Sequence, residues 1–281
     1  LGVEKKTVER LRRKEHEPWP IDESHPAFVF DPNKCVLCGK CVRTCRELSG
    51  VGAIDIAFRG EASRISPFAG RPLSDSTCQS CGECVARCPT GALMPKHAAA
   101  AESEVTTICP YCGVGCSLVL GVEGDRIVSV RGAPESPVNQ GELCVKGRFG
   151  MDFVNHPDRL LRPLIRKEKR SAADAGRPVA ELFREADWEE ALDLIARGLQ
   201  DTLDRHGPDA IGVLSSAKTT NEDNFVVQKL ARSVLGTNNV DHCARLCHAS
   251  TVAAALAAFG DGAMSNSIAD VDHADLVMII G

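Results

Sequence analysis

The stretch Cys109-Pro-Tyr-Cys112-Gly-Val-Gly-Cys116, followed farther along by Cys144-Val-Lys146-Gly, decides how this chain is organised. Three cysteines lie close together and a fourth returns from a distant part of the sequence, which is a spacing typical of metal sites. Thiolates are soft ligands that suit iron–sulfur clusters and zinc. The stretch therefore predicts one four-cysteine metal site.

A β-hairpin is predicted between the third and the fourth of these cysteines. Residues 117–122 and 126–131 are rich in β-forming side chains, and Glu123-Gly-Asp125 separates them. A hairpin would bring Cys144 back beside Cys109 and Cys116. Spacing alone leaves zinc open beside an iron–sulfur cluster, because one four-cysteine site suits either metal.

Upstream cysteines form two runs with the same spacing, C-x2-C-x2-C-x3-C. This repeat is the signature of a two-cluster bacterial ferredoxin, in which the fourth cysteine of each run ligates the other cluster. Zinc is the alternative, but it needs only four cysteines per ion and does not explain the doubled frame. A third cluster beside these two would extend an electron path, whereas a zinc ion would end it. We expect [4Fe–4S] clusters on two crossed sets, Cys35, Cys38, Cys41 and Cys88, and Cys78, Cys81, Cys84 and Cys45.

Composition argues against several other classes of protein. The chain has 281 residues, which suggests two or three domains, and 43% of them are hydrophobic, enough for a packed core. A formal charge of −5 gives no sign of nucleic acid as a partner. We expect no membrane span, because no apolar run approaches the ~18 residues that it needs. Residues 1–13 lack the hydrophobic centre of a signal peptide.

Fourteen cysteines are many for a chain of this size. Disulfides are the alternative to metal, but they belong to small secreted domains. Twelve of the fourteen fall into the three ligand-like groups, which favours a reducing compartment. We therefore expect a cytoplasmic protein.

We expect the chain to be a fragment at both ends, since it begins with Leu1 and since 276–281 resemble a strand cut off at a βα turn. The expected fold class is α+β followed by α/β. A solvated helix is predicted near 5–14, a surface excursion over 57–77, and a linker or loose helix over 97–104. The expected regions are a lead-in segment (1–32), a two-cluster ferredoxin-like domain (33–100), a small β-rich [4Fe–4S] domain (105–165) and the start of a parallel-sheet α/β domain (180–281).

The α/β pattern begins with a helix that Asp187 caps, with Glu190 completing a capping box. Strand, loop and helix then alternate, which is typical of a parallel sheet whose loops bind phosphate-bearing cofactors. The predicted buried face of the first helix consists of Ala191, Leu194, Ile195, Leu199 and Leu203. The later elements are strands at 210–215, 239–241 and 274–280 and helices at 224–235 and 246–259.

Taken together, three motifs resemble the molybdenum/tungsten bis-pterin oxidoreductases, most of all the catalytic subunit of formate dehydrogenase. They are the Cys109–Cys116 stretch, Gly141-Glu-Leu-Cys144-Val-Lys146-Gly-Arg148, and Ala244-Arg-Leu-Cys247-His248. The likeness runs from about 33 to 281. It implies the oxidation of formate to CO2 at Mo or W held by two molybdopterin guanine dinucleotides.

The same resemblance implies roles for single residues. Cys109, Cys112, Cys116 and Cys144 would hold a [4Fe–4S] cluster. Lys146 would relay electrons between this cluster and the pterin, Cys247 would ligate the metal, and His248 would assist proton handling. The loop from Ser215 to Asn224 would approach the pterin. The expected pterin-binding residues are Lys146, Ser215, Asn221, Glu222, Asn224 and Arg245.

Plainer interpretations remain for some of these residues. Cys247 lies on an apolar stretch and could be a buried structural thiol. Lys146 alone would be an ordinary solvated lysine. Cys243 fits no ligand set, so we expect it to be structural. We expect three histidines, His206, His242 and His273, to lie at the surface.

The lead-in resembles family members that couple formate to NAD. The expected partners are therefore subunits that carry iron–sulfur or flavin groups and react with NAD, with any further clusters upstream of Leu1. The family's catalytic arginine would lie beyond Gly281. Two rivals stay open, an assimilatory nitrate reductase and a complex I-type electron-transfer subunit without molybdenum; the Cys247-His248 pair argues against both.

Overall fold

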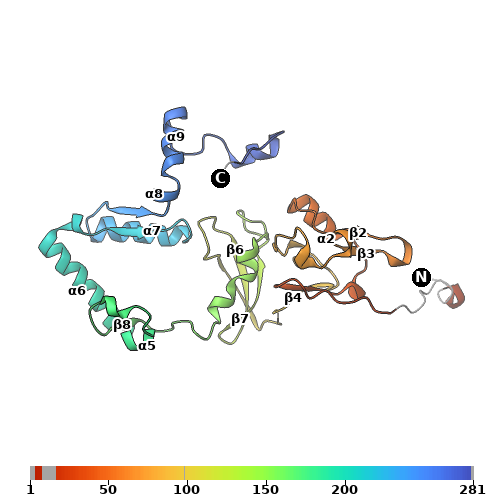
Figure 1. Ribbon diagram of the computed structural model, residues 1–281, viewed down its shortest axis with the longest axis horizontal. Coiled ribbons are helices and arrows are strands. Elements are labelled where there is room, and N and C mark those ends of the chain that lie inside the picture. Colours follow the sequence, from red (N-terminus) through yellow and green to blue (C-terminus); the bar gives the residue numbers. More distant parts are fainter. Residues whose placement is uncertain (1–3, 8–16, 98, 280–281) are drawn as a thin grey trace. The chain divides into compact units, whose positions relative to one another are not determined.

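The computed structural model describes residues 4–7, 17–97 and 99–279. The chain forms two compact units, which are considered separately below (Figure 1). The first unit consists of 1–109 with 116–159, and the second of 110–115 with 160–281. The helix predicted near 5–14 falls largely outside the described residues.

The ferredoxin-like part of the first unit is built from very short elements. Strand β1 (Phe28–Phe30) pairs antiparallel with β4 (Leu93–Pro95). Helices α2 (Lys40–Arg43) and α3 (Glu83–Ala86) each contain the third cysteine of a run, and a π-helical turn (Thr44–Leu48) extends α2. A 3-10 turn (Pro32–Lys34) precedes the first run.

The sequence repeat is also a repeat of backbone conformation. Gly39 and Gly82, each next to the second cysteine of its run, have φ of +70° and +72°, and Leu37 and Ser80 also have positive φ. Glycine adopts this left-handed conformation without steric cost, so it allows both helices to begin directly after the turn. Equivalent turns therefore present the two runs.

The segment 57–77 was expected to be a surface excursion, and that prediction is wrong. Strand β2 (Asp55–Ala57) pairs antiparallel with β3 (Arg64–Ser66), and three 3-10 turns surround them (Gly60–Ala62, Phe68–Gly70 and Leu73–Asp75). Ile65 and Leu73 are buried in the same apolar core as Phe28 and Phe30. The Leu73 N–H also donates to Asp22 Oδ2 at 2.9 Å. The segment therefore contributes two side chains to the core, although much of the rest of it is exposed.

The predicted hairpin is confirmed. Strands β6 (Ser117–Glu123) and β7 (Arg126–Gly132) pair antiparallel, with a bulge at Gly121 and Val122. A third strand, β5 (Ser103–Ile108), pairs with β6 and makes a meander. The linker predicted over 97–104 is therefore too long, because Ser103 and Glu104 already form ladder pairs. Helix α4 (Val145–Phe149) and a 3-10 turn (Met151–Val154) follow.

The second unit begins with a small antiparallel pair, β8 (Leu164–Arg166) and β9 (Phe183–Glu185). Between them lie a 3-10 turn (Ala172–Asp174) and α5 (Val179–Leu182). The long helix α6 (Trp188–His206) starts at Asp187 as predicted. The Asp187 side chain accepts from the Glu190 N–H at 2.8 Å, but the Glu190 carboxylate pairs with Arg184, so only half of the capping box forms.

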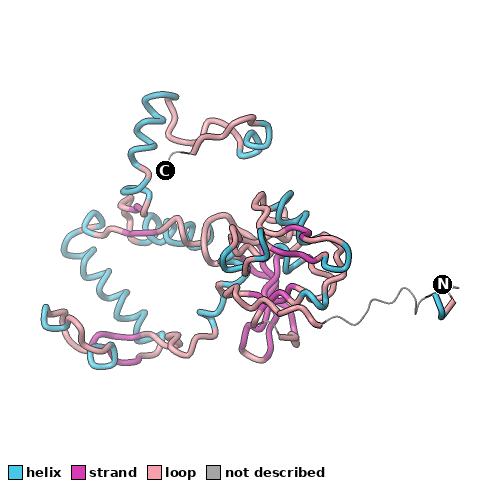
Figure 2. The backbone as a smooth tube through the Cα atoms, turned by 45° about the vertical axis from the view of Figure 1, so that its right-hand side comes forward, coloured by secondary structure: helices cyan, strands magenta, loops and turns pink. Residues whose placement is uncertain are grey.

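The predicted parallel pairing is confirmed for β10 (Val213–Ser215) and β11 (Val240–His242). A 3-10 turn (Pro208–Ala210) precedes β10, and α7 (Asn221–Lys229) with a π-helical turn (Leu230–Val234) connects the two strands. Then follow α8 (Ala244–Cys247), α9 (Ala249–Phe259) and a 3-10 turn (Ile268–His273). Figure 2 shows how short the strands of the described residues are.

Several burial and boundary predictions for this unit are wrong. On α6 only Ala191 is buried, while Leu194 and Ile195 are exposed; Leu214 of β10 is 86% exposed. Residues 274–279 form no strand within the described part of the chain, and Leu276 is exposed. A parallel sheet buries its strands when helices cover both faces. Here the described residues supply only a two-stranded pair, which is too small to cover these side chains.

Two helix boundaries also differ from the prediction. Helix α7 begins at Asn221 and not at 224, because Thr220 and Asp223 form a capping box that the sequence analysis overlooked. The helix predicted over 246–259 is broken at His248, where α8 ends and α9 begins.

Candidate iron–sulfur and metal centres

The first crossed set of thiols lines one hollow in the ferredoxin-like part. Burial raises the pKa of the Cys41 thiol to about 11, and repulsion by the neighbouring thiolates adds to this effect. Backbone N–H groups point at two of the sulfurs, from Leu37 to Cys35 Sγ at 3.4 Å and from Leu93 to Cys88 Sγ at 3.5 Å. The thiols that share this hollow are Cys35, Cys38, Cys41 and Cys88.

The second set is gathered in the same way. Burial raises the pKa of Cys84 strongly, and the thiols of Cys78, Cys81, Cys41 and Cys45 add to this shift. Burial also raises the pKa of Cys78, with contributions from Cys81 and Cys45. The Ser80 N–H donates to Cys78 Sγ at 3.4 Å, and the Ala53 N–H to Cys45 Sγ at 3.2 Å. Cys45 thus lies with the cysteines of the other run, which is the neighbourhood that a crossed arrangement requires.

The donor sets suit [4Fe–4S] clusters. Each set offers four thiols in mostly apolar surroundings with N–H donors directed at sulfur, and such hydrogen bonds are among the features that tune these clusters. Burial without a metal disfavours the thiolate form, whereas iron would stabilise it. Among the residues that the structure describes, no three Cys, His, Asp or Glu side chains converge closely enough for a single ion, so this fit rests on the donor sets themselves.

Three of the four cysteines predicted for the third site belong to the first unit. The Cys109 N–H donates to the Cys116 carbonyl at 2.8 Å, and Cys144 is the N-terminal cap of α4. A Cβ at Gly147 would lie 3.6 Å from Cys109 Sγ, so α4 packs against this buried thiol. Lys146, in the first turn of α4, is exposed.

Asn139 clamps the loop before Cys144 to the start of β6. Its Oδ1 accepts from the Ser117 N–H at 2.9 Å, and its Nδ2 donates to the Glu142 carbonyl at 2.7 Å. The sequence analysis missed this residue, although an asparagine between a hairpin and a cysteine loop is a common loop-fixing residue.

The fourth cysteine, Cys112, lies in the segment 110–115 of the second unit. This segment is tied to α7, because Asn221 Nδ2 donates to the Gly113 carbonyl at 2.8 Å. Asn221 was predicted to bind a pterin; in the structure its amide holds the cysteine loop. Glu222 beside it is exposed.

Ser215 and Asn224, also predicted to bind a pterin, hold the loop after β10. The Ser215 hydroxyl donates to Asn224 Oδ1, and Asn224 Nδ2 donates to the carbonyls of Ser216 and Thr220 at 3.3 and 3.1 Å. Since β10 and β11 are parallel, this loop lies at the same edge as the turn that follows β11. That turn leads into α8, which ends at Cys247, and His248 follows it.

The predicted metal ligand Cys247 ends α8 and is exposed, so the structure gives no support to a buried structural thiol. Its Sγ lies 3.3 Å from the Cys243 carbonyl oxygen. His248, the residue between α8 and α9, is exposed as well. Arg245 Nε donates to Asp241 Oδ2 at 2.6 Å, and this ion pair lowers the pKa of Asp241. The three histidines that we expected at the surface, His206, His242 and His273, are exposed.

Cys243 was expected to be structural, but it is exposed, and it is the functional candidate that sequence reasoning missed. A hydrogen bond from the Ala217 N–H lowers the pKa of its thiol to about 7, with further contributions from His242 and Ser216. The thiol therefore faces the loop after β10. Its position directly after a parallel strand was the available signal, because the carboxyl ends of such strands carry functional residues.

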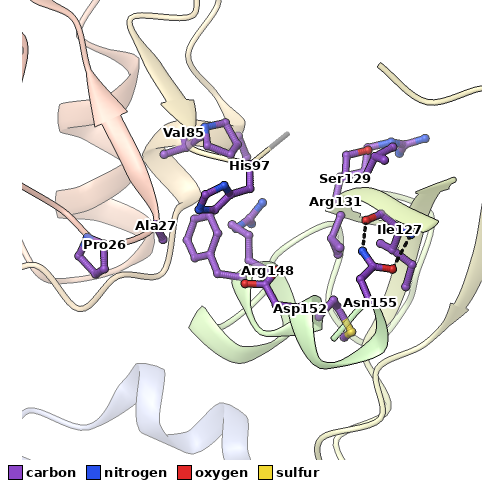
Figure 3. Close-up of a pocket in the computed structure, with 16 residues that line it drawn as sticks. Pro26, Ala27, Val85, His97, Ile127, Ser129, Arg131, Arg148, Asp152 and Asn155 are labelled. Atoms are coloured by element: carbon purple, nitrogen blue, oxygen red, sulfur yellow. Dashed lines mark hydrogen bonds between the residues drawn. The ribbon is translucent and has the colours of Figure 1, made fainter. Parts of the chain in front are cut away.

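A cavity of about 470 Å³ lies elsewhere in the first unit and contains none of the predicted site residues. Figure 3 shows Val85 and His97 on one side of it, Ile127 and Asn155 on the other, and Arg148 between them. The described residues contain no helix that combines the length and the apolar character of a membrane span.

Comparison with known families divides the chain into three matched parts. Residues 34–92 match the 4Fe-4S dicluster domain, 102–156 the molybdopterin oxidoreductase Fe4S4 domain, and 159–281 the molybdopterin oxidoreductase domain. The chain belongs to the molybdopterin oxidoreductase family and carries its iron–sulfur domains with part of its molybdopterin domain. These matches favour [4Fe–4S] clusters over zinc.

Curated relatives are similar over nearly the whole chain. "Probable oxidoreductase YjgC" of Bacillus subtilis (strain 168) is 36% identical over 310 residues, and "Putative formate dehydrogenase SAR2393" of Staphylococcus aureus (strain MRSA252) is 33% identical over 311 residues. Each alignment covers 95% of this chain, which spans 30% of the length of either relative.

A chain of a solved NAD+-reducing [NiFe]-hydrogenase in the H2-reduced state is 40% identical over the part that aligns. The alignment covers 28% of this chain and 33% of that chain, with a TM-score of 0.26. This overlap is too small to define a fold.

Proposed function

We propose that this chain is part of the catalytic subunit of a formate dehydrogenase. In this proposal, formate is oxidised to CO2 at Mo or W held by two molybdopterin guanine dinucleotides, and electrons leave through three [4Fe–4S] clusters. The observation that carries the proposal is the edge of the parallel pair β10 and β11. Cys247 and His248 follow this edge and belong to the same unit as the Cys112 loop, which Asn221 fastens to α7, and this supports the proposal.

In this proposal, each of the three clusters is held by one set of four cysteines. The crossed sets are Cys35, Cys38, Cys41 and Cys88, and Cys78, Cys81, Cys84 and Cys45. The third set is Cys109, Cys112, Cys116 and Cys144. The gathering of Cys45 with the second run, together with the domain matches, supports this assignment.

The chain's own residues have defined tasks. When bound, the pterin-held metal supplies the two-electron oxidation of formate. Cys247 offers an accessible thiolate as a ligand, and His248, next to it and exposed, can take up the released proton. Lys146 follows the proposed cluster ligand Cys144 by two residues and is exposed, and it would relay electrons between that cluster and the pterin.

We propose fewer residues in direct contact with the pterin than the sequence suggested. Glu222 and Arg245 are exposed near the loop edge and remain candidates. Ser215, Asn221 and Asn224 would act by shaping the loops, because their side chains already hold backbone carbonyls or each other.

Partner subunits would accept the electrons. The resemblance to NAD-coupled members supports partners that carry iron–sulfur or flavin groups and react with NAD. Reduced clusters fit a reducing compartment, and we place the protein in the cytoplasm.

The test is Cys247→Ala in the full-length protein, with Leu246→Ala as the matched control on the same helix, because the Leu246 side chain is 93% exposed. We expect Cys247→Ala to abolish formate oxidation while all cluster signals persist, and Leu246→Ala to retain activity. Formate oxidation that survives in Cys247→Ala would refute the ligand assignment. Nitrate reduction without formate oxidation would favour the nitrate reductase, and absence of Mo and W from the purified protein would favour the complex I-type subunit.

A further inference from the structure

A buried ion pair joins the second cysteine run to the helix that follows Cys144. The two charged side chains belong to Glu83 and Arg148, and they are only 4% and 5% exposed. No other ion pair among the described residues has both partners so deeply buried. Burying each charge costs several kcal/mol in desolvation, so the pair is not explained by its contribution to stability alone.

The pair contacts both cluster-binding segments directly. Glu83 lies between the predicted ligands Cys81 and Cys84, and Arg148 Nε donates to the Cys81 carbonyl at 2.9 Å. The Glu83 carboxylate accepts from the Arg148 guanidinium and, at 2.9 Å, from the N–H of Leu143, the residue before Cys144. Each end of the pair therefore touches a segment that carries cluster ligands.

A second layer of contacts reinforces this junction. Arg87, beside Cys88, bridges the Glu83 and Glu142 carboxylates. A Cβ at Gly82 would lie 2.4 Å from Arg148 Cδ and 2.6 Å from Phe149 Cζ, so α4 presses on the backbone of the second run. The separation of the two segments is thus fixed by charge, hydrogen bonding and close packing.

The junction also provides a short hydrogen-bonded route between the two sites. The Arg148 side chain reaches the Cys81 carbonyl, and the Arg148 backbone N–H donates to the Cys144 carbonyl at 3.0 Å. Electron tunnelling weakens exponentially with distance and is stronger through bonds than through empty space.

We propose that the Glu83–Arg148 pair sets the spacing and the electronic contact between the cluster on Cys78, Cys81, Cys84 and Cys45 and the cluster on the Cys109–Cys144 set. This inference rests on the cluster assignment of the proposed function. Each transfer moves one electron: one cluster is oxidised, the other is reduced, and no bond is made or broken. The electrons come from the proposed oxidation of formate. Arg148 is a positioning residue and not a catalytic one.

The test compares Arg148→Met and Arg148→Lys with a matched control, Arg131→Met, in the full-length protein. Arg131 belongs to the same unit and pairs with Glu104 at 2.6 Å, but its side chain is 51% exposed, and this ion pair joins β7 to β5 outside both cysteine segments. The readouts are iron content and the spin–spin splitting between reduced clusters in electron paramagnetic resonance spectra. If Arg148 only helped the protein to retain a cluster, a variant with full iron content would show the same splitting as the wild type.

We expect Arg148→Met to keep its iron and lose the splitting, and Arg131→Met to match the wild type. Full iron content with wild-type splitting in Arg148→Met would overturn the proposal, and so would an equal loss in Arg131→Met. If Arg148→Met loses iron, Arg148→Lys decides, because it keeps the charge but cannot bridge Glu83 and the Cys81 carbonyl as a guanidinium does. Full iron with weakened splitting in Arg148→Lys supports the proposal; full iron with unchanged splitting, or iron loss in both variants, overturns it.

The outcome is separable from that of the proposed function. Formate oxidation is assayed on the same wild-type sample with a dye that accepts electrons. Splitting that depends on Arg148 in a protein without formate oxidation would refute the substrate and leave the positioning role intact. Formate oxidation together with a splitting that does not depend on Arg148 would refute the positioning role and leave the proposed substrate intact.

Discussion

The ferredoxin-like part of the first unit and the α/β segment of the second differ in what holds them together. The former has strands of three residues and helices of four, yet its apolar core closes around two sets of thiols. The latter has a helix of 19 residues, of which one is buried. Regular secondary structure and a closed core are thus separate properties. A set of metal ligands can hold a core together even where there is little regular secondary structure.

The largest difference between the two regions should appear on removal of iron. We expect chelation under anaerobic conditions to unfold the ferredoxin-like part, since structural metal sites contribute on the order of 10 kcal/mol to folding. Helix α6 contains no predicted ligand and should keep its amide protection. Hydrogen exchange of both regions measures this. Unchanged protection at Phe28 and Ile54 after iron loss would show that the apolar core suffices by itself.

A matched pair of leucines sharpens the contrast in burial. Leu118 on β6 is 0% exposed, and Leu214 on β10 is 86% exposed. We expect Leu118→Ala to lower the free energy of unfolding by about 2–5 kcal/mol, because it removes packed methyl groups and leaves a cavity. Leu214→Ala should change it by about 0.5 kcal/mol or less. Urea unfolding of both variants provides the measurement, and equal losses would contradict the exposure of Leu214.

The smallest expected effect concerns the cap of α7, the helix that holds the Cys112 loop. Thr220→Ala removes the hydroxyl that accepts from the Asp223 N–H at 3.1 Å, which should cost about 1 kcal/mol. Thr202→Ala on α6 is the control, because its hydroxyl donates to a carbonyl within the helix and caps nothing. Thermal unfolding of the two variants compares them. A cost at Thr202 as large as that at Thr220 would argue against the cap.

The sequence predicted those features that depend on spacing along the chain. The crossed neighbourhood of Cys45, the hairpin before Cys144 and the cap at Asp187 all follow from residues at fixed intervals, where local chemistry decides. The parallel pairing of β10 and β11 follows from the alternation of strand and helix. The structure contains the hairpin, the cap and the parallel pairing, and Cys45 lies near Cys78 as a crossed set would require.

Burial was harder to predict because it depends on what packs against a residue. Ile65 and Leu73 lie in a mostly polar segment yet belong to the core, whereas Leu194 and Leu276 look like core residues and are exposed. The burial of Glu83 and Arg148 was equally hard to predict, because a charged residue is expected to be exposed to solvent unless its partner is known. Cys243 was misjudged since its contacts come from a loop far away in sequence.

The way in which the backbone passes between the two units bears on how either could be prepared alone. A fragment that starts at 160 would lack 110–115, and Asn221 would lose the Gly113 carbonyl that it binds. A fragment that contains 1–159 would likewise include 110–115, which belong to the second unit. A gene that fuses 110–115 directly to 160–281 would keep this hydrogen bond within one fragment.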